Sequence, residues 1–389
     1  MSKTVFYNAN IVGEKGVLEG RALLVENGVI KEFCKEDSFE NVEKVDCKNG
    51  YLFPGFVDIH VHGGGGSDFM DGTPNDMETA IQTHLEHGTT SIFPTTMSAT
   101  MAEIQHTFDV YREMKKRGKV KANVFGLHLE GPFISSAMCG AQRKDLIIPP
   151  TEKEIGILKE NADIIARISC APEVEGVLDM AKALLPLGVS FSLGHTMATY
   201  EQAEEAYEQG FSSITHLYSA TSGFHKVNQK VHIGVTQAAY GIDGLYPELI
   251  GDGCHVPKEL LRLVLRFKGE DKVCLVTDAM RAAGTELTES FLGAKVPENR
   301  VIIEDGVAKL PDRSFFAGSI GTMDRALRFA VKTAGVSLQT AAKITSLTPA
   351  TLMGIQDRKG SISIGKDADL VLMNEDMYLQ KVFVGGKAI

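Results

Sequence analysis

The sequence has 389 residues, of which 43% are hydrophobic and 23% are charged, with a formal net charge of −10. An acidic chain without a lysine- and arginine-rich segment gives no support to nucleic-acid binding. No apolar run reaches the ~18 residues of a membrane-spanning helix, and the opening MSKTVFYNANIVG lacks the apolar core of a secretion signal. The six scattered cysteines, without a CxxC pair, indicate reduced thiols. We therefore expect a cytoplasmic protein that binds neither nucleic acid nor membrane.

Both ends of the chain are predicted to be β-rich. Asn-Gly dipeptides at 27–28 and 49–50 are turn signals that separate strand-like segments. The stretch GSISIGKDADLVLMNEDMYLQKVFVGGKAI likewise has short apolar strands interrupted by glycine and aspartate. We therefore expect residues 1–53 and 358–389 to form one small β-sandwich domain.

Residues 54–357 are predicted to form a second domain, in which apolar strands alternate with helices. Eight strands is the number that closes a (β/α)8 barrel, so the predicted fold is an α/β, TIM-like barrel with the small β-sandwich domain beside it. The expected helices lie at 76–87, 101–117, 152–160, 175–186, 198–209 and 257–267. The expected strands are GFVDIH, TSIFPTT, ANVFGLHLE, DIIARISC, VSFSLGH, SSITHL, ELIGDG and KVCLVTD.

Imidazole and carboxylate side chains recur where these strands end. His60 and His62 lie two residues apart, and the period of a strand puts both rings on one face. Taken singly, each such residue has an ordinary explanation, as a core histidine, a helix cap or a turn residue. In a barrel, however, the carboxyl ends of all strands meet at one mouth. The predicted site is His60, His62, Glu130, His195, His216, His255 and Asp278.

The residue types at this mouth indicate metal-assisted hydrolysis. Imidazole and carboxylate ligands suit Zn²⁺, Fe²⁺, Co²⁺ or Mn²⁺. Such a metal lowers the pKa of a bound water from about 15.7 towards about 7 and polarises a carbonyl group. A neighbouring carboxylate can accept the proton of that water and pass it to a leaving amine. Serine catalysis has no support, because the sequence contains no GxSxG elbow.

Several longer motifs resemble one family along nearly the whole chain. They include PGFVDIHVHGGGG, GLHLEGPFIS, GHTMATYEQA, THLYSAT, GDGCHV, LVTDAMRAAG and GSISIGKDADLVL. In this order they resemble the N-acetylglucosamine-6-phosphate deacetylases of the amidohydrolase superfamily. The resemblance implies a barrel with a small β-sandwich, one or two divalent metal ions (zinc or iron), a homodimer, and hydrolysis of N-acetylglucosamine 6-phosphate to the amino sugar phosphate and acetate.

The resemblance also implies a role for each site residue. Asp278 matches the catalytic acid and base, and His255 matches a catalytic residue that contacts the substrate near the scissile carbonyl. The ligands of one metal are Glu130, His195 and His216. Those that bind or border a second metal position are His60, His62 and Asp278. The substrate-binding positions are Ala141, Gln142, Ser219, Ala220, His225, Lys226, His255, Phe316, Ala317 and Gly318.

Departures from the family pattern fall in the substrate pocket. The motif after His216 continues as Ser219-Ala220-Thr221 where the family has Asn-Ala-Met. In the segment 225–230, Val227 takes the place of an arginine that binds phosphate in the family, and an aliphatic side chain cannot make that contact. Lys226 or Lys230 can substitute only as a point charge.

Two alternatives therefore stay open. One keeps the chemistry but changes the substrate to an unphosphorylated or different N-acyl amino sugar, including N-acetylgalactosamine 6-phosphate. The other is a non-catalytic scaffold that retains the barrel, against which the full set of ligands and Asp278 argue.

Overall fold

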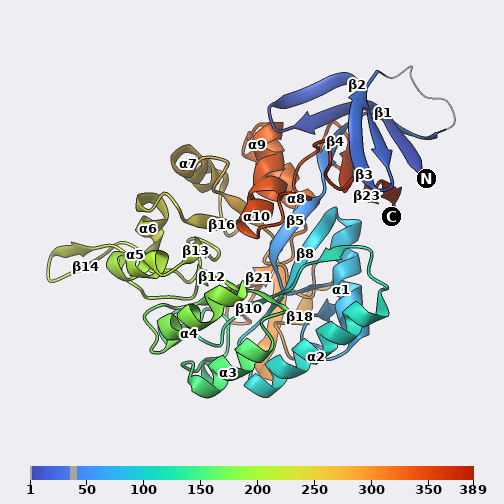
Figure 1. The fold of residues 1–389 in the computed structure, drawn as a ribbon. Helices are drawn as coiled ribbons and strands as arrows, with labels where there is room; N and C mark the ends of the chain where they lie inside the picture. Colours follow the sequence, from blue (N-terminus) through green and yellow to red (C-terminus); the bar gives the residue numbers. More distant parts are fainter. Residues whose placement is uncertain (1, 36–41) are drawn as a thin grey trace.

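In the computed structural model, which describes residues 2–35 and 42–389, the two ends of the chain lie together in one sheet beside a barrel (Figure 1). The sheet has seven strands in the order β24-β23-β22-β4-β1-β2-β3. Strand β4 pairs in parallel with β1 on one side and antiparallel with β22 on the other, which joins the two ends. The strands of this sheet are β1 (Lys3–Gly13), β2 (Gly16–Glu26), β3 (Val29–Cys34), β4 (Glu43–Pro54), β22 (Leu370–Met373), β23 (Leu379–Val384) and β24 (Lys387–Ala388).

This sheet has its own apolar core, to which both ends contribute. The rings of Phe6 and Phe383 meet edge to face with centroids 4.9 Å apart. Ile11, Leu52 and Leu370 are fully buried in the same cluster. The burial of apolar surface from both ends holds them together.

Eight parallel strands form the barrel, in the order β17-β16-β13-β12-β11-β10-β8-β5. The first and last are joined where the backbone N–H of Asp278 donates to the carbonyl oxygen of His60 at 2.9 Å. The short β9 (Asn123–Val124) pairs only with β8. The predicted fold class is confirmed. The barrel strands are β5 (Phe56–Val61), β8 (Thr89–Thr96), β10 (Leu127–Glu130), β11 (Ile165–Cys170), β12 (Ser190–Leu193), β13 (Phe211–Ile214), β16 (Tyr246–Ile250) and β17 (Cys274–Val276).

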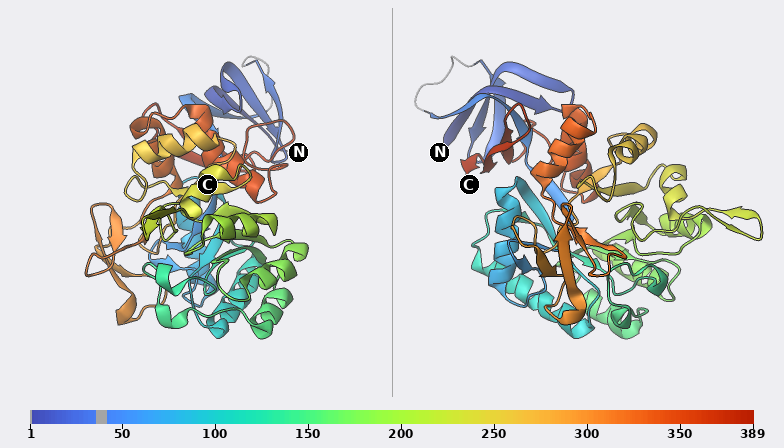
Figure 2. Two further views of the ribbon diagram at one scale, coloured as in Figure 1. Left: turned by 90° about the vertical axis from the view of Figure 1, so that its left-hand side faces the viewer. Right: turned by 180° about the vertical axis from the view of Figure 1, so that it is seen from behind.

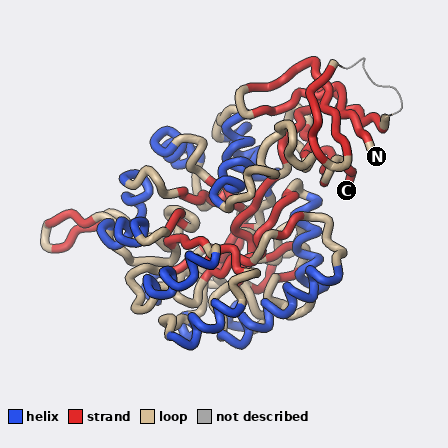
Figure 3. The backbone as a smooth tube through the Cα atoms, viewed as in Figure 1, coloured by secondary structure: helices blue, strands red, loops and turns tan. Residues whose placement is uncertain are grey.

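Helices surround the barrel strands (Figures 2 and 3). The predicted bounds of α2 and α3 agree with the structure, because each helix begins with a capping box, Thr100 with Glu103 and Thr151 with Glu154. Among the described residues, no helix is long and apolar enough to cross a membrane. The α-helices are α1 (Pro74–Glu86), α2 (Met101–Arg117), α3 (Glu152–Glu160), α4 (Val177–Leu184), α5 (Tyr200–Glu208), α6 (Val235–Gly241), α7 (Lys258–Lys268), α8 (Met323–Arg328), α9 (Leu338–Ala342) and α10 (Thr348–Leu352). Phe329–Thr333 and Lys343–Leu347 are π-helical.

Short strands outside the barrel were not predicted, because segments of two to five residues carry too little periodicity. The hairpin of β14 (His225–Val227) and β15 (Lys230–His232) projects from the body in Figure 1. Between β17 and α8 lies a four-stranded sheet of β18 (Glu289–Phe291), β19 (Arg300–Glu304), β20 (Val307–Lys309) and β21 (Phe316–Ser319). Ser319 N–H donates to the Asp278 carbonyl at 2.8 Å, so this inserted sheet is tied to the end of the barrel. Two-residue strands β6 (Gly63–Gly64) and β7 (Ser67–Asp68) follow β5.

Candidate metal and active site

Three candidate site residues lie just beyond the barrel strands in an unusual backbone conformation. His195, His216 and Asp278 each come two residues after the last residue of their strand. Their φ angles are 47°, 31° and 47°, in the left-handed region that residues other than glycine seldom occupy. Such a conformation costs on the order of 1–3 kcal/mol and is concentrated at functional sites. The barrel therefore holds three strained residues at one mouth.

Glu130, His195 and His216 form the first ligand cluster. Glu130 Oε1 lies 3.2 Å from His195 Nε2 and 2.9 Å from His216 Nε2. The two Nε2 atoms are 3.2 Å apart, and all three side chains are buried.

The ring nitrogens that face away from this cluster fix its protonation. Nδ1 of His195 lies 2.8 Å from the carbonyl oxygen of Met138, and Nδ1 of His216 lies 3.0 Å from that of Ser219. Because a carbonyl only accepts, each Nδ1 carries the hydrogen and each Nε2 of a neutral ring presents a lone pair. Two lone pairs thus converge with a carboxylate oxygen, and these residues fit a divalent metal ion.

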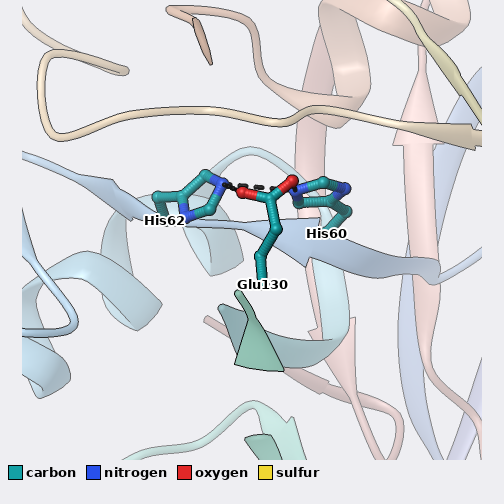
Figure 4. Close-up of side chains that lie close together, drawn as sticks. All are labelled: His60, His62 and Glu130. Atoms are coloured by element: carbon teal, nitrogen blue, oxygen red, sulfur yellow. Dashed lines mark hydrogen bonds and ion pairs between the residues drawn. The ribbon is translucent and has the colours of Figure 1, made fainter. Parts of the chain in front are cut away.

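His60, His62 and Glu130 form a second cluster that shares the glutamate (Figure 4). Figure 4 shows the carboxylate of Glu130 between the two imidazole rings. Oε1 lies 3.4 Å from His60 Nε2, and Oε2 lies 3.4 Å from His62 Nε2. Within each cluster the potential ligand atoms all lie within 4.8 Å of one another. The donor set therefore fits one or two divalent ions, and Glu130 can contribute an oxygen to each.

The carboxylates of the site are ionised at neutral pH. Burial raises the pKa of Asp278, but His60 and His62 outweigh it and bring that pKa down to about 2. Burial likewise raises the pKa of Glu130, whereas His195 and His60 hold it well below its usual range. Conversely, burial lowers the pKa of His216, but Glu130 raises it to about 9. The buried carboxylates therefore favour positive charge among them, which protons on the histidines supply as long as no metal ion takes their place.

His255 lies at the same mouth and is oriented by one aspartate. Its Nδ1 is 2.7 Å from Asp252 Oδ2, and its backbone N–H donates to Asp252 Oδ1 at 2.9 Å. Its ring packs against Phe316 with centroids 4.8 Å apart. Because Nδ1 is held by Asp252, Nε2 is the ring nitrogen left for other contacts.

A cavity of about 330 Å³ opens above the two clusters. Glu130, His62, His195, His216, His255 and Asp278 all contribute to its wall. Among the described residues that line it there is no lysine or arginine. The other lining residues are Met97, Gly140, Ala141, Gln142, Tyr218, Ser219, Ala220, Leu292, Phe315, Phe316 and Gly318.

The structure separates the residues expected to bind substrate into three groups. Most of them line the cavity, namely Ala141, Gln142, Ser219, Ala220, His255, Phe316 and Gly318. Ala317 is fully buried in β21 and does not line it. His225 and Lys226 are exposed on the projecting hairpin, away from the lining.

Gln142 also contacts the two ligand clusters directly. Its Nε2 donates to Glu130 Oε2 at 2.9 Å, and its Oε1 accepts from the backbone N–H of Ser98 at 2.9 Å. The amide is thereby fixed from both sides, and it holds Glu130 in turn. Leu292 and Phe315, which also line the cavity, were missed because they flank the unpredicted short strands and belong to no motif.

Comparisons with known proteins agree with this geometry. The model of the Amidohydrolase family matches residues 51–389. The N-acetylglucosamine-6-phosphate deacetylase of Bacillus subtilis (strain 168) is 33% identical over 94% of this chain and 92% of its own. The crystal structure of the Pasteurella multocida N-acetylglucosamine-6-phosphate deacetylase is 31% identical, with a TM-score of 0.92 over 100% and 99% of the two chains. A Mycobacterium smegmatis deacetylase variant in complex with N-acetyl-D-glucosamine-6-phosphate is 26% identical, with a TM-score of 0.89 over 100% and 99%.

Proposed function

We propose that this chain, which belongs to the N-acetylglucosamine-6-phosphate deacetylases of the amidohydrolase family, removes the acetyl group of N-acetylglucosamine 6-phosphate. The products are the amino sugar phosphate and acetate, which places the enzyme in amino sugar metabolism. The observation that carries the proposal is the pair of ligand clusters that share Glu130 at the base of a cavity. Its volume, about 330 Å³, lies within the ~300–1,000 Å³ usual for small-molecule sites.

The residues that would hold the metal are those of the two clusters. Glu130, His195 and His216 offer one position, and His60 with His62 offers the second. Nitrogen and oxygen donors of this kind favour zinc or iron. A divalent ion there supplies a Lewis acid that polarises the acetyl carbonyl and lowers the pKa of water.

The protein residues move the protons and orient the substrate. Asp278 is ionised and lines the cavity, so its carboxylate can take the proton of the attacking water. The protonated Asp278 then delivers this proton to the sugar nitrogen as the amide bond breaks. His255, fixed by Asp252, contacts the substrate beside the acetyl carbonyl.

A second candidate substrate is supported by the lack of cationic side chains around the cavity. The described lining residues include neither lysine nor arginine. Val227 lies on the exposed hairpin, where the family pattern has an arginine. These observations favour an unphosphorylated N-acetyl amino sugar unless Lys226 or Lys230 contacts the phosphate.

Acetate release from matched substrates tests the proposal. The four sugars are N-acetylglucosamine, N-acetylgalactosamine and the 6-phosphate of each, assayed with protein loaded with Zn²⁺ or Fe²⁺. We expect the highest kcat/KM for N-acetylglucosamine 6-phosphate. Equal turnover of the free sugar would favour the second candidate, and turnover of none of the four would contradict both.

Domain limits, assembly and location complete the proposal. We propose that residues 1–53 and 358–389 form the small domain, and that 54–357 form the catalytic barrel. The pairing of β4 with β1 and β22 supports this division. A homodimer in the cytoplasm remains our prediction, and light scattering after size-exclusion chromatography measures the assembly.

A further inference from the structure

A buried ion pair lies inside the barrel next to the second metal cluster. Arg167 of β11 and Glu248 of β16 form it, and their side chains are 1% and 0% exposed. Arg167 Nη2 also donates to Ser192 Oγ at 2.7 Å and Ser213 Oγ at 3.0 Å. Neither residue lines the cavity. The pair therefore touches the reacting groups only through other side chains.

The second oxygen of Glu248 contacts a metal-binding histidine. Oε2 lies 3.2 Å from His60 Nδ1. An ionised carboxylate only accepts, so Nδ1 of His60 carries the hydrogen and Nε2 presents its lone pair. That Nε2 is the atom that faces Glu130 and lies 3.2 Å from His62 Nε2. Glu248 thus selects the ring nitrogen that His60 offers to a metal.

His60 differs from the other histidines of the clusters because its Nδ1, and not only its Nε2, has a charged partner among the described residues. His195 and His216 donate to uncharged backbone carbonyls. Nδ1 of His62 has no hydrogen-bond partner among the described residues. A carboxylate behind a metal-binding imidazole fixes its tautomer and increases its basicity. In the second cluster, the tautomer and basicity of His60 are therefore the ones that a carboxylate controls.

The ion pair has no evident value for stability alone. Burying two charges costs several kcal/mol for each ion, and apolar residues of similar volume are often as stabilising. Nε and Nη1 of Arg167 have no hydrogen-bond partner within the described part of the chain, so the guanidinium is incompletely compensated. Positioning of a side chain at the site, rather than stability, accounts for the presence of these two charges inside the barrel.

We propose that Arg167 and Glu248 are positioning residues that hold His60 with Nε2 towards Glu130, and that they thereby set the metal affinity of the His60–His62–Glu130 cluster. Arg167 orients the Glu248 carboxylate, and Glu248 orients the imidazole. The proposal rests on the metal-dependent function proposed above, because it assumes that this cluster binds a metal.

The test compares Zn²⁺ affinities of metal-free protein by titration against a chromophoric chelator. In the double variant Arg167→Met/Glu248→Leu both charges are removed together, which avoids leaving one charge unpaired. We expect its weaker Zn²⁺ site to lose about 10–100-fold in affinity, as measured for other partners of metal ligands. The Glu130–His195–His216 site should keep its wild-type affinity. Thermal unfolding is followed in parallel.

Two further variants separate positioning from general packing. Ser213→Ala removes one contact to Arg167 without touching Glu248 or His60, and both Zn²⁺ affinities should stay unchanged. Glu248→Gln keeps the shape and an acceptor oxygen for Nδ1, so it should weaken the second site less than the double variant does. If the double variant does not fold, the affinity of the second Zn²⁺ site is compared between Glu248→Gln and wild type. A weaker affinity in Glu248→Gln supports the positioning role, and an unchanged affinity contradicts it.

The outcomes distinguish this proposal from the proposed function. If the wild-type chain binds two Zn²⁺ ions and neither affinity changes in a folded Glu248 variant, the positioning role is wrong while the deacetylase function stands. Binding of a single Zn²⁺ that His60→Asn does not affect also overturns the positioning role. A wild-type chain that binds no Zn²⁺, Fe²⁺ or Mn²⁺ contradicts the proposed function itself.

Discussion

Asp278 Oδ1 lies 3.2 Å from His62 Nε2, and the two residues come from opposite ends of the barrel sequence, just after β17 and just after β5. The contact exists because the last strand closes onto the first. It places an ionised carboxylate beside the second ligand cluster and on the cavity wall. Asp278 therefore lies beside the second ligand cluster and on the cavity wall at the same time.

Asp278→Asn should abolish most of the turnover while leaving metal in the protein. The amide keeps the shape of the side chain but cannot take up a proton at neutral pH, and general base catalysis contributes about 10²–10⁴-fold. The measurements are kcat for acetate release and metal content by mass spectrometry. Asp163→Asn, on an exposed aspartate paired with Arg112, is the control that should keep wild-type activity. Retained activity in Asp278→Asn would remove this residue from the proton transfer.

Removal of the metal should stop hydrolysis reversibly. Dialysis against a chelator is expected to abolish acetate release, and addition of Zn²⁺ or Fe²⁺ should restore it. His195→Ala should prevent that recovery, because it removes one lone pair from the first cluster. His106→Ala is the matched control, since His106 is exposed on α2 and its Nε2 lies 3.1 Å from the carbonyl oxygen of Gly72, outside both clusters. Full activity in the presence of excess chelator would contradict metal catalysis.

Gln142 should contribute to the affinity for metal as well as to the binding of substrate. Gln142→Leu removes the donor that holds Glu130 Oε2 and leaves this oxygen without its 2.9 Å contact. Loss of such a partner weakens metal binding by about 10–100-fold. Zn²⁺ affinity measured without substrate isolates this effect, and Arg143→Leu, a substitution of the exposed neighbour, is the comparison. An unchanged affinity would limit Gln142 to the substrate contacts predicted from the sequence.

The hairpin lysines should matter only for a phosphorylated substrate. The described cavity lining holds no cationic side chain, so the exposed Lys226 and Lys230 are the candidate contacts to phosphate. For Lys226→Met/Lys230→Met we expect KM for N-acetylglucosamine 6-phosphate to rise about tenfold, equivalent to about 1.4 kcal/mol. KM for free N-acetylglucosamine should not change, and Lys116→Met on α2 serves as the control. A double variant with unaltered KM for both sugars would exclude the hairpin from phosphate binding.

Acid should destabilise the fold partly through Asp324 at the start of α8. Burial raises the pKa of Asp324, but His87, 3.2 Å away, and the Thr322 hydroxyl outweigh it and lower that pKa below its usual value. A depressed carboxyl pKa contributes stability above the unfolded value of about 3.9, and this contribution is lost as pH falls through the folded pKa. Asp324→Asn should therefore cost about 1–2 kcal/mol at pH 7 and less at pH 3.

Guanidinium unfolding of metal-free protein at pH 7, 4 and 3 measures this difference. Asp376→Asn, on an exposed aspartate 3.6 Å from Lys332, should show no such pH dependence. A difference between wild type and Asp324→Asn that stays constant down to pH 3 would show that ionisation of Asp324 is not its source.

The elements with strong local signals could be predicted from the sequence. The capping boxes at Thr100 and Thr151 mark where α2 and α3 begin. The apolar strands were recognisable because both of their faces are buried, as in β5 and β8. The positions of His60, Glu130 and Asp278 at strand ends followed from the predicted set of eight strands. In a parallel barrel the carboxyl ends of all strands lie at one mouth.

The tertiary structure alone decided how those side chains meet. The closure of β17 onto β5 sets the Asp278–His62 contact, and the packing of β11 beside the other strands brings Arg167 to Glu248. Neither contact has a local signal, because the partners are distant in the chain and their strands read as ordinary apolar segments. The absence of lysine and arginine from the described cavity lining likewise has no local signal, because the lining residues are distant from one another in the chain. The sequence determined which potential ligands the barrel mouth holds, and the packing between strands decided which of their atoms face one another and the cavity.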